Sequence, residues 1–225
     1  MKPRLLDLFC GAGGCSAGYY RDGFDVVGVD IMPQKHYPFA FILCDAIDVL
    51  RRMMAGEKFL ASGGQWYGIE DFDAIHASPP CQRYSKTQKL AGKDHPMLIG
   101  DVRTALIATS KPYIIENVVG APLITPFVLC GSMFGLRTMR SRLFECNFPV
   151  PFMLASPPVK HTKMGRVPKD GEYMHIVGNF SGIEAARVAM DIDWMNRKEI
   201  AQAIPPAYTE WIGKHLLEYL GAADD

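Results

Sequence analysis

The strongest constraint on the fold is an alternation of short apolar runs with helical stretches. The apolar runs have the length and composition of buried strands and lie at residues 4–9, 24–30, 39–45, 71–78 and 112–118. Helical patterns are expected between them, near 16–21 and at 46–56 and 97–109. Strands that alternate with helices predict an α/β fold with a doubly wound, mostly parallel sheet.

The pattern changes in the second half of the chain. Short strand candidates lie at 127–135 and 141–146, and helical patterns return at 182–190, 196–204 and 207–220. The segment between them is rich in Pro, Gly, Lys and His and has little periodicity. We therefore expect a core over 1–146, a small irregular subdomain over 147–182, and C-terminal helices over 183–225 that return to the core.

Composition limits the classes of protein that the chain can belong to. No apolar run reaches the length of about 18 residues that spans a bilayer, and Asp7 interrupts the short stretch after Lys2 and Arg4, which argues against a signal peptide. The six cysteines form no CxxC pair and no zinc spacing, so free thiols in a reducing compartment are expected, with no metal. These features predict a cytoplasmic protein without a membrane partner.

The charge is unevenly distributed although the formal net charge is zero. Residues 82–93 carry four basic and no acidic side chains, and residues 137–170 carry seven basic against two acidic ones. Solvated loop faces would explain either run alone. Together the two runs favour a one-sided phosphate-binding face.

The first strand ends in a glycine turn, and the next two strands end in acids. In doubly wound sheets, ligands bind beyond the carboxyl ends of the strands. The turn "DLFCGAGG" supplies Gly11, Gly13 and Gly14 for a close approach to the backbone, although a tight packing turn would use the same residues. Asp30 is placed to bind ribose hydroxyls, and Asp45 to bind an adenine amino group or to cap the following helix. The combination favours an adenosyl ligand.

Four further motifs follow in order: "PPCQ" at 79–82, "ENV" at 116–118, "TMRSRLF" at 138–144 and "AQAIPP" at 201–206. With the glycine turn, they resemble the cofactor, nucleophile, acid, Q-x-R-x-R and last motifs of the DNA cytosine-5 methyltransferase family. The matches cover the chain from residue 5 to about 213 in the family's order. The resemblance implies the Rossmann-like fold of methyltransferases that use S-adenosyl-L-methionine and release S-adenosyl-L-homocysteine.

The resemblance also implies a mechanism, because carbon 5 of cytosine is too weak a nucleophile to take a methyl group unaided. The Cys81 thiolate would add to carbon 6 of a base flipped out of double-stranded DNA. Glu116 would hydrogen-bond ring nitrogen N3 and the exocyclic amine, best in its protonated form. Arg140 and Arg142 would bind the carbonyl oxygen of the base and an adjacent phosphate.

Other positions receive roles by the same analogy. Asn117 would hold the Cys81 loop, with a turn residue as the alternative. Phe9 and Ile31 would pack on the adenosine, and Pro80 and Leu98 would line its adenine side. Core packing is the alternative for these four residues. Gln202 lies where the family has an asparagine near the cofactor. The residues expected to contact DNA are Gln82, Arg83, Lys86, Lys89, Lys160, Lys163 and Arg166.

The chain departs from the family pattern in three places. Thr138 replaces the first Gln of Q-x-R-x-R, Pro79 lies where phenylalanine is usual, and only 147–182 is available for target recognition. The short segment predicts a target of a few base pairs at most. It also suits a monomeric bacteriophage or prophage enzyme that acts without a restriction partner.

Three other interpretations remain open at this point. The same chemistry can act on RNA, since the family has a tRNA-directed branch. An amino-methyltransferase carries an [DNS]-P-P-aromatic tetrad, which Ser78-Pro79-Pro80 imitates until Cys81. A DNA-binding module that has lost catalysis would keep the fold without the activity.

Overall fold

The computed structural model describes residues 2–80, 98–153, 160–161, 166, 168–169 and 171–223, with the backbone alone at 160–161 and 222–223. Its main sheet has seven strands in the order β3-β2-β1-β6-β7-β9-β8. These are β1 (Arg4–Leu8), β2 (Asp25–Asp30), β3 (Ala40–Leu43), β6 (Ala74–Ala77), β7 (Tyr113–Val118), β8 (Phe127–Leu129) and β9 (Arg142–Cys146). The chain runs outward from β1 to β3 and then crosses to β6, so the strand order reverses between β1 and β6. Ligands of doubly wound sheets bind at such a reversal.

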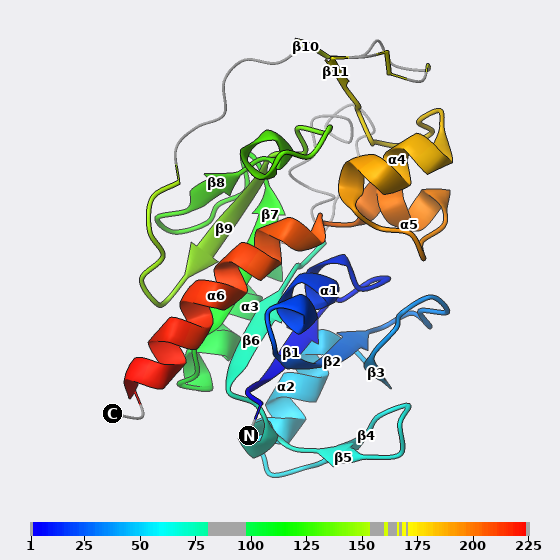
Figure 1. The fold of residues 1–225 in the computed structure, drawn as a ribbon. Coiled ribbons are helices and arrows are strands. Elements are labelled where there is room, and N and C mark those ends of the chain that lie inside the picture. Colours follow the sequence, from blue (N-terminus) through cyan, green and yellow to red (C-terminus); the bar gives the residue numbers. More distant parts are fainter. Residues whose placement is uncertain are drawn as a thin grey trace.

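The first five strands of this sheet are parallel, and β9 then pairs antiparallel with both β7 and β8. Helices cover both of its faces (Figure 1). Helices α1 (Gly14–Arg21) and α6 (Pro206–Ala223) pack on one face, and α2 (Ala46–Met54) and α3 (Leu98–Ala108) on the other. Strand β1 shows why both faces are apolar: Leu5 packs with α1 and α6, whereas Leu6 and Leu8 pack toward α2 and α3. The predicted α/β class with a doubly wound, mostly parallel sheet is confirmed.

A third apolar cluster lies beside the glycine turn. It joins α4 (Ile183–Met190) and α5 (Arg197–Gln202) to Met174, Ile176 and Phe180, and Ala12 of the turn packs into it. The remaining short elements are β4 (Phe59–Leu60), β5 (Trp66–Tyr67), η1 (Ile69–Asp71), η2 (Gly131–Phe134), β10 (Lys160–His161) and β11 (Glu172–Tyr173). The cluster therefore places the C-terminal helices next to the expected cofactor turn.

Candidate active site

The turn after β1 and the loop after β2 are tied together by one carboxylate. Asp30 accepts a hydrogen bond from the Gly11 amide at 3.0 Å and another from the Met32 amide at 2.9 Å. Gly11 has a positive φ of 51°, and a Cβ built there would have no atom within 4 Å. The backbone at Gly11 is thus both left-handed and open, which is what a closely approaching ligand requires.

The other two predicted glycines of the turn face protein. A Cβ at Gly13 would lie 2.9 Å from the Tyr37 ring, and one at Gly14 would collide with the Ile204 carbonyl of the last motif. The packing alternative therefore accounts for these two glycines. A side chain would thus have open space at Gly11, whereas protein atoms fill the Cβ positions of Gly13 and Gly14.

The other residues expected to hold the cofactor differ in exposure. Ile31 is 65% exposed at the carboxyl end of β2, and Pro80 is also exposed, whereas Phe9 and Leu98 are half-buried against the α2 and α3 core. Gln202 is exposed at the end of α5. An exposed Ile31 beside Asp30 supplies an apolar surface and a hydrogen-bonding group at one strand end. This combination fits an adenosine.

Asp45 caps helix α2. One of its carboxylate oxygens accepts hydrogen bonds from the amides of Ile47 and Asp48, both at 3.0 Å. The helix-cap alternative is therefore realised.

Glu116 is buried on β7 beside Arg142 of β9. Arg142 pairs with Val118 in the antiparallel register, and Glu116 is two residues before Val118 on the same face of the sheet. The two side chains are therefore diagonal neighbours, and Arg142 Nε is 3.1 Å from Glu116 Oε1. Burial raises the pKa of the Glu116 carboxyl, while Arg142 and a hydrogen bond from the Ser78 hydroxyl oppose that rise. A buried acid with a raised pKa and an arginine partner suits reversible protonation.

Asn117 ties this acid to the proline loop after β6. Its side-chain amide donates to the Pro79 carbonyl at 2.9 Å, and its carbonyl oxygen accepts from the Val118 amide at 3.0 Å. The loop therefore leaves the sheet directly beside Glu116. Cys81 lies outside the described residues, as do Gln82, Arg83, Lys86, Lys89 and Lys163.

Arg140 is engaged with three backbone carbonyls. It donates from Nε to Ala203 at 2.5 Å, from Nη1 to Ile176 at 2.6 Å and from Nη2 to Ala201 at 2.8 Å. Its side chain joins the segment before β9 to the third apolar cluster and to the last motif. Thr138, which replaces the family's glutamine, also contacts the third apolar cluster, because its hydroxyl donates to the Met174 carbonyl at 3.1 Å.

Of the expected DNA contacts, Arg166 and Lys160 are described in part. Arg166 makes a 2.7 Å ion pair with Glu172, which is itself buried, and Lys160 is described only as backbone in β10. The structure therefore leaves the DNA contacts of this segment as predictions.

Sequence reasoning missed several buried polar side chains at the same sheet end. Tyr19, His76 and Ser78 form a hydrogen-bonded row that leads to Glu116. Asp7 of β1 is fully buried and accepts a hydrogen bond from Ser16, and burial raises its pKa to about 7. The signal was present in the sequence, because Asp7 and His76 interrupt runs that otherwise read as buried strands.

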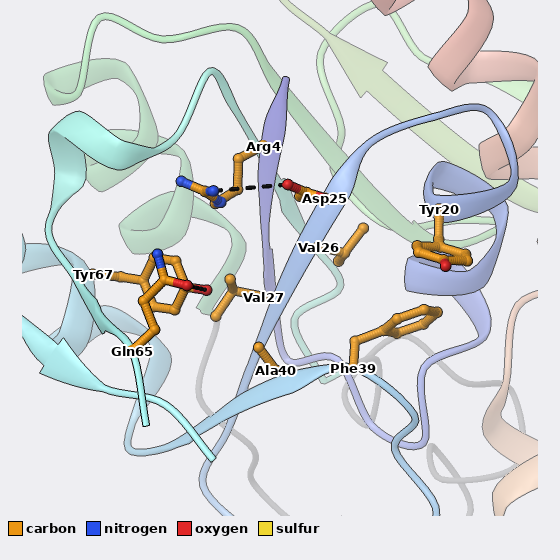
Figure 2. A pocket seen from close by; sticks show the side chains of 9 residues that line it. All are labelled: Arg4, Tyr20, Asp25, Val26, Val27, Phe39, Ala40, Gln65 and Tyr67. Atoms are coloured by element: carbon orange, nitrogen blue, oxygen red, sulfur yellow. Dashed lines mark hydrogen bonds and ion pairs between the residues drawn. The ribbon is translucent and has the colours of Figure 1, made fainter. Parts of the chain in front are cut away.

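A surface pocket of about 290 Å³ lies at the opposite end of the strands (Figure 2). Arg4 and Asp25, the first residues of β1 and β2, form a 3.7 Å ion pair there, and the rings of Tyr20, Phe39 and Tyr67 also line the pocket. The pocket is therefore separate from the strand ends that carry Asp30 and Glu116.

Two general features hold for the described part of the chain. No three His, Cys, Asp or Glu side chains within it are grouped so that they could hold a metal ion. None of its helices combines the length and the apolar character that crossing a membrane requires.

Two curated proteins are similar in sequence to part of this chain. Type II methyltransferase M.XorII of Xanthomonas oryzae pv. oryzae is 32% identical over 124 residues, which are 53% of this chain and 29% of that protein. M.AquIA of Picosynechococcus sp. is 26% identical over 124 residues, again 53% of this chain and 50% of the relative. The matches thus span half or less of these relatives' own lengths.

Solved structures share the fold over almost the whole chain. A candidate DNA modification methyltransferase encoded within a prophage of E. coli aligns with a TM-score of 0.60 at 15% identity, covering 97% of this chain and 99% of that one. The S. pombe Dnmt2 methyltransferase aligns with a TM-score of 0.57 at 12% identity, covering 98% of this chain and 99% of that one. The model of the C-5 cytosine-specific DNA methylase family matches residues 3–121, more than half of the 225 residues, so the chain belongs to that family.

Proposed function

We propose that this protein transfers a methyl group from S-adenosyl-L-methionine to carbon 5 of a flipped-out cytosine in double-stranded DNA, through a covalent bond between Cys81 and carbon 6. The observation that carries the proposal is the arrangement around Glu116. A buried acid with an arginine partner stands beside the proline loop, and Asn117 fixes that loop two residues before Cys81. This is the arrangement of acid, cation and nucleophile loop that attack on a cytosine ring needs.

The cofactor is proposed from the fit of the residues at the ends of β1 and β2. The open backbone at Gly11, the carboxylate of Asp30 and the exposed side chain of Ile31 suit the nucleoside part of S-adenosyl-L-methionine. Phe9, Pro80, Leu98 and Gln202 complete the proposed site. The bound cofactor would supply an electrophilic methyl group.

Each remaining site residue has a proposed task on the base. The Cys81 thiolate attacks carbon 6, which makes carbon 5 nucleophilic. Glu116 donates a hydrogen bond to N3 and thereby offsets the charge that develops on the ring, and Arg142 binds the carbonyl oxygen. After methylation, water or another base removes the carbon-5 proton, and the Cys81 sulfur leaves as thiolate.

The division of the chain is also a proposal. Residues 1–146 would bind the cofactor and carry the chemistry, 147–182 would recognise DNA, and 183–225 would close the core. Arg166 is held by Glu172, and the Arg137 guanidinium contacts the Lys169 and Glu172 carbonyls. So small a segment supports contacts to phosphates more than extensive base reading, and a target of a few base pairs follows.

The test is methyl transfer with labelled S-adenosyl-L-methionine, using plasmid DNA and tRNA as separate acceptors. We expect label in DNA at carbon 5 of cytosine, mapped by bisulfite sequencing, with none after Cys81→Ala. The matched control is Cys44→Ala, a half-buried cysteine of the same chain that should leave the rate unchanged.

A covalent complex with DNA that contains 5-fluorocytosine would support the nucleophile. Label in tRNA alone would move the same chemistry to RNA. Label on an amino group that persists in Cys81→Ala would contradict the proposal and favour amino-methylation.

A further inference from the structure

A row of hydrogen-bonded side chains connects helix α1 with Glu116 through the interior. The Tyr19 hydroxyl lies 2.9 Å from His76 Nδ1, and His76 Nε2 lies 3.0 Å from the Ser78 hydroxyl oxygen. Ser78 in turn acts on Glu116, because a hydrogen bond from its side chain lowers the pKa of that carboxyl. Tyr19 and His76 are fully buried, so the row is shielded from solvent over most of its length.

The direction of each hydrogen bond in this row follows from the carboxylate of Glu116, at which the row ends. When Glu116 is ionised it only accepts, so Ser78 then gives its single hydrogen to Glu116. Ser78 must then accept from His76 Nε2–H. Burial lowers the pKa of His76 to about 3, which keeps the ring neutral, so Nδ1 is the acceptor and the Tyr19 hydroxyl donates to it. Each donor thus points toward Glu116.

Resting on the function proposed above, we infer that Ser78, oriented by His76 and Tyr19, is a positioning residue that holds Glu116 as an aimed carboxylate until a base is bound. Ser78 is three residues before Cys81 on the same loop, and its hydroxyl is the last donor of the row. The row thereby connects the loop of the nucleophile with the acid.

Several other charged or titratable groups face Glu116. Arg142 of β9 and Arg140 before it favour the carboxylate, whereas Asp7 of β1, Cys15 of α1 and Tyr208 of α6 couple to it unfavourably. Cys15 Sγ also lies 3.9 Å from the Ser78 hydroxyl oxygen. All of these groups remain when the Ser78 hydroxyl is removed, so its effect can be measured alone.

The experiment compares the wild-type protein with Ser78→Ala, Tyr19→Phe and Ser78→Thr. Ser78→Ala removes the hydrogen bond that Ser78 donates to the carboxylate form of Glu116. The protonation midpoint of Glu116 should therefore rise by about one pH unit. Since the protonated form acts on the base, the alkaline limb of the methylation rate moves up by the same amount. Tyr19→Phe, which frees the His76 tautomer, gives a smaller shift in the same direction, and Ser78→Thr, which keeps the hydroxyl, restores the wild-type profile.

A second measurement does not depend on activity. Infrared titration, with Glu116→Gln as the blank that identifies the Glu116 carboxyl band, gives the protonation midpoint directly. Thr209→Val is the control, because it removes another buried hydroxyl, one that donates to the Cys15 and Pro206 carbonyls and does not contact Glu116. Its midpoint should equal that of the wild type.

The outcomes separate the two proposals. If no nucleic acid is methylated at any pH, the proposed function fails, and the infrared midpoints still decide the role of Ser78. If Ser78→Ala lowers the rate but leaves both the alkaline limb and the infrared midpoint unchanged, Ser78 is only structural and the inference is overturned. A downward shift of the midpoint would overturn it as well.

Discussion

The Arg140→Lys substitution tests whether this arginine serves the fold or the substrate. Arg140 is 9% exposed, and its guanidinium donates to the carbonyls of Ala203, Ile176 and Ala201 at 2.5 to 2.8 Å. A lysine ammonium at this position retains one of the three hydrogen bonds and leaves two carbonyls without their donor. A hydrogen bond to a charged group contributes about 1.5 to 3 kcal/mol, so the loss of two should lower the free energy of unfolding by about 3 to 6 kcal/mol.

The assay is equilibrium unfolding in urea, followed by circular dichroism. Arg137→Lys is the matched control in the same segment, because its guanidinium is partly exposed and its two carbonyl contacts are 3.1 and 3.5 Å long. We expect the control to change the free energy of unfolding by less than about 1 kcal/mol. Full stability of Arg140→Lys together with lost methylation would refute the structural reasoning and restore the role in binding the base that the family resemblance implies.

Three further substitutions probe the buried acids and the proline loop. Glu116→Gln should lower the methylation rate by about 100-fold to 10,000-fold while binding of S-adenosyl-L-homocysteine, measured by calorimetry, stays unchanged; weakened binding would contradict a role confined to the base. Asn117→Ala should cost about 1 to 3 kcal/mol of stability in urea unfolding and lower the rate by about tenfold to 100-fold, because the Pro79 carbonyl loses its donor and the loop its anchor. Burial raises the Asp7 pKa to about 7 from 3.8, so the folded state keeps a proton that the unfolded state has lost, and stability falls as pH rises between these values. From about pH 5 to pH 8 the free energy of unfolding of the wild type should therefore fall by about 3 kcal/mol relative to that of Asp7→Asn. Parallel curves of unfolding free energy against pH for the two proteins would exclude this ionisation.

Much of the fold could be predicted from the sequence because its strands and helices carry their periodicity locally. The five parallel strands and the helices that alternate with them lie where the apolar runs and amphipathic stretches predict them. The sequence predicts no element between the helix at 46–56 and the strand at 71–78, whereas the structure forms the hairpin of β4 and β5 there, followed by η1. Strands of two residues carry too little periodicity to be recognised.

The candidate site was predictable to a smaller extent. The positions of Asp30, Glu116 and Asn117 at strand ends follow from the α/β pattern, since the carboxyl ends of parallel strands meet at one edge. The partners of these side chains do not follow from it. Asp45 fits a contact with an adenine amino group and a helix cap equally well in the sequence, and only the structure shows that its carboxylate accepts from the amides of Ile47 and Asp48.

By itself, the sequence determined the α/β class, the order of the motifs and the chemical types that surround the site, because these depend on local periodicity and residue identity. Tertiary structure decided which groups meet. The register of β7 against β9 brings Arg142 to Glu116, and the return of the C-terminal segment brings three carbonyls to Arg140. The pairing of β6 with β7 and the packing of α1 bring Tyr19, His76 and Ser78 into one hydrogen-bonded row. Contacts between residues distant in sequence depend on packing and strand register, and no local pattern encodes them.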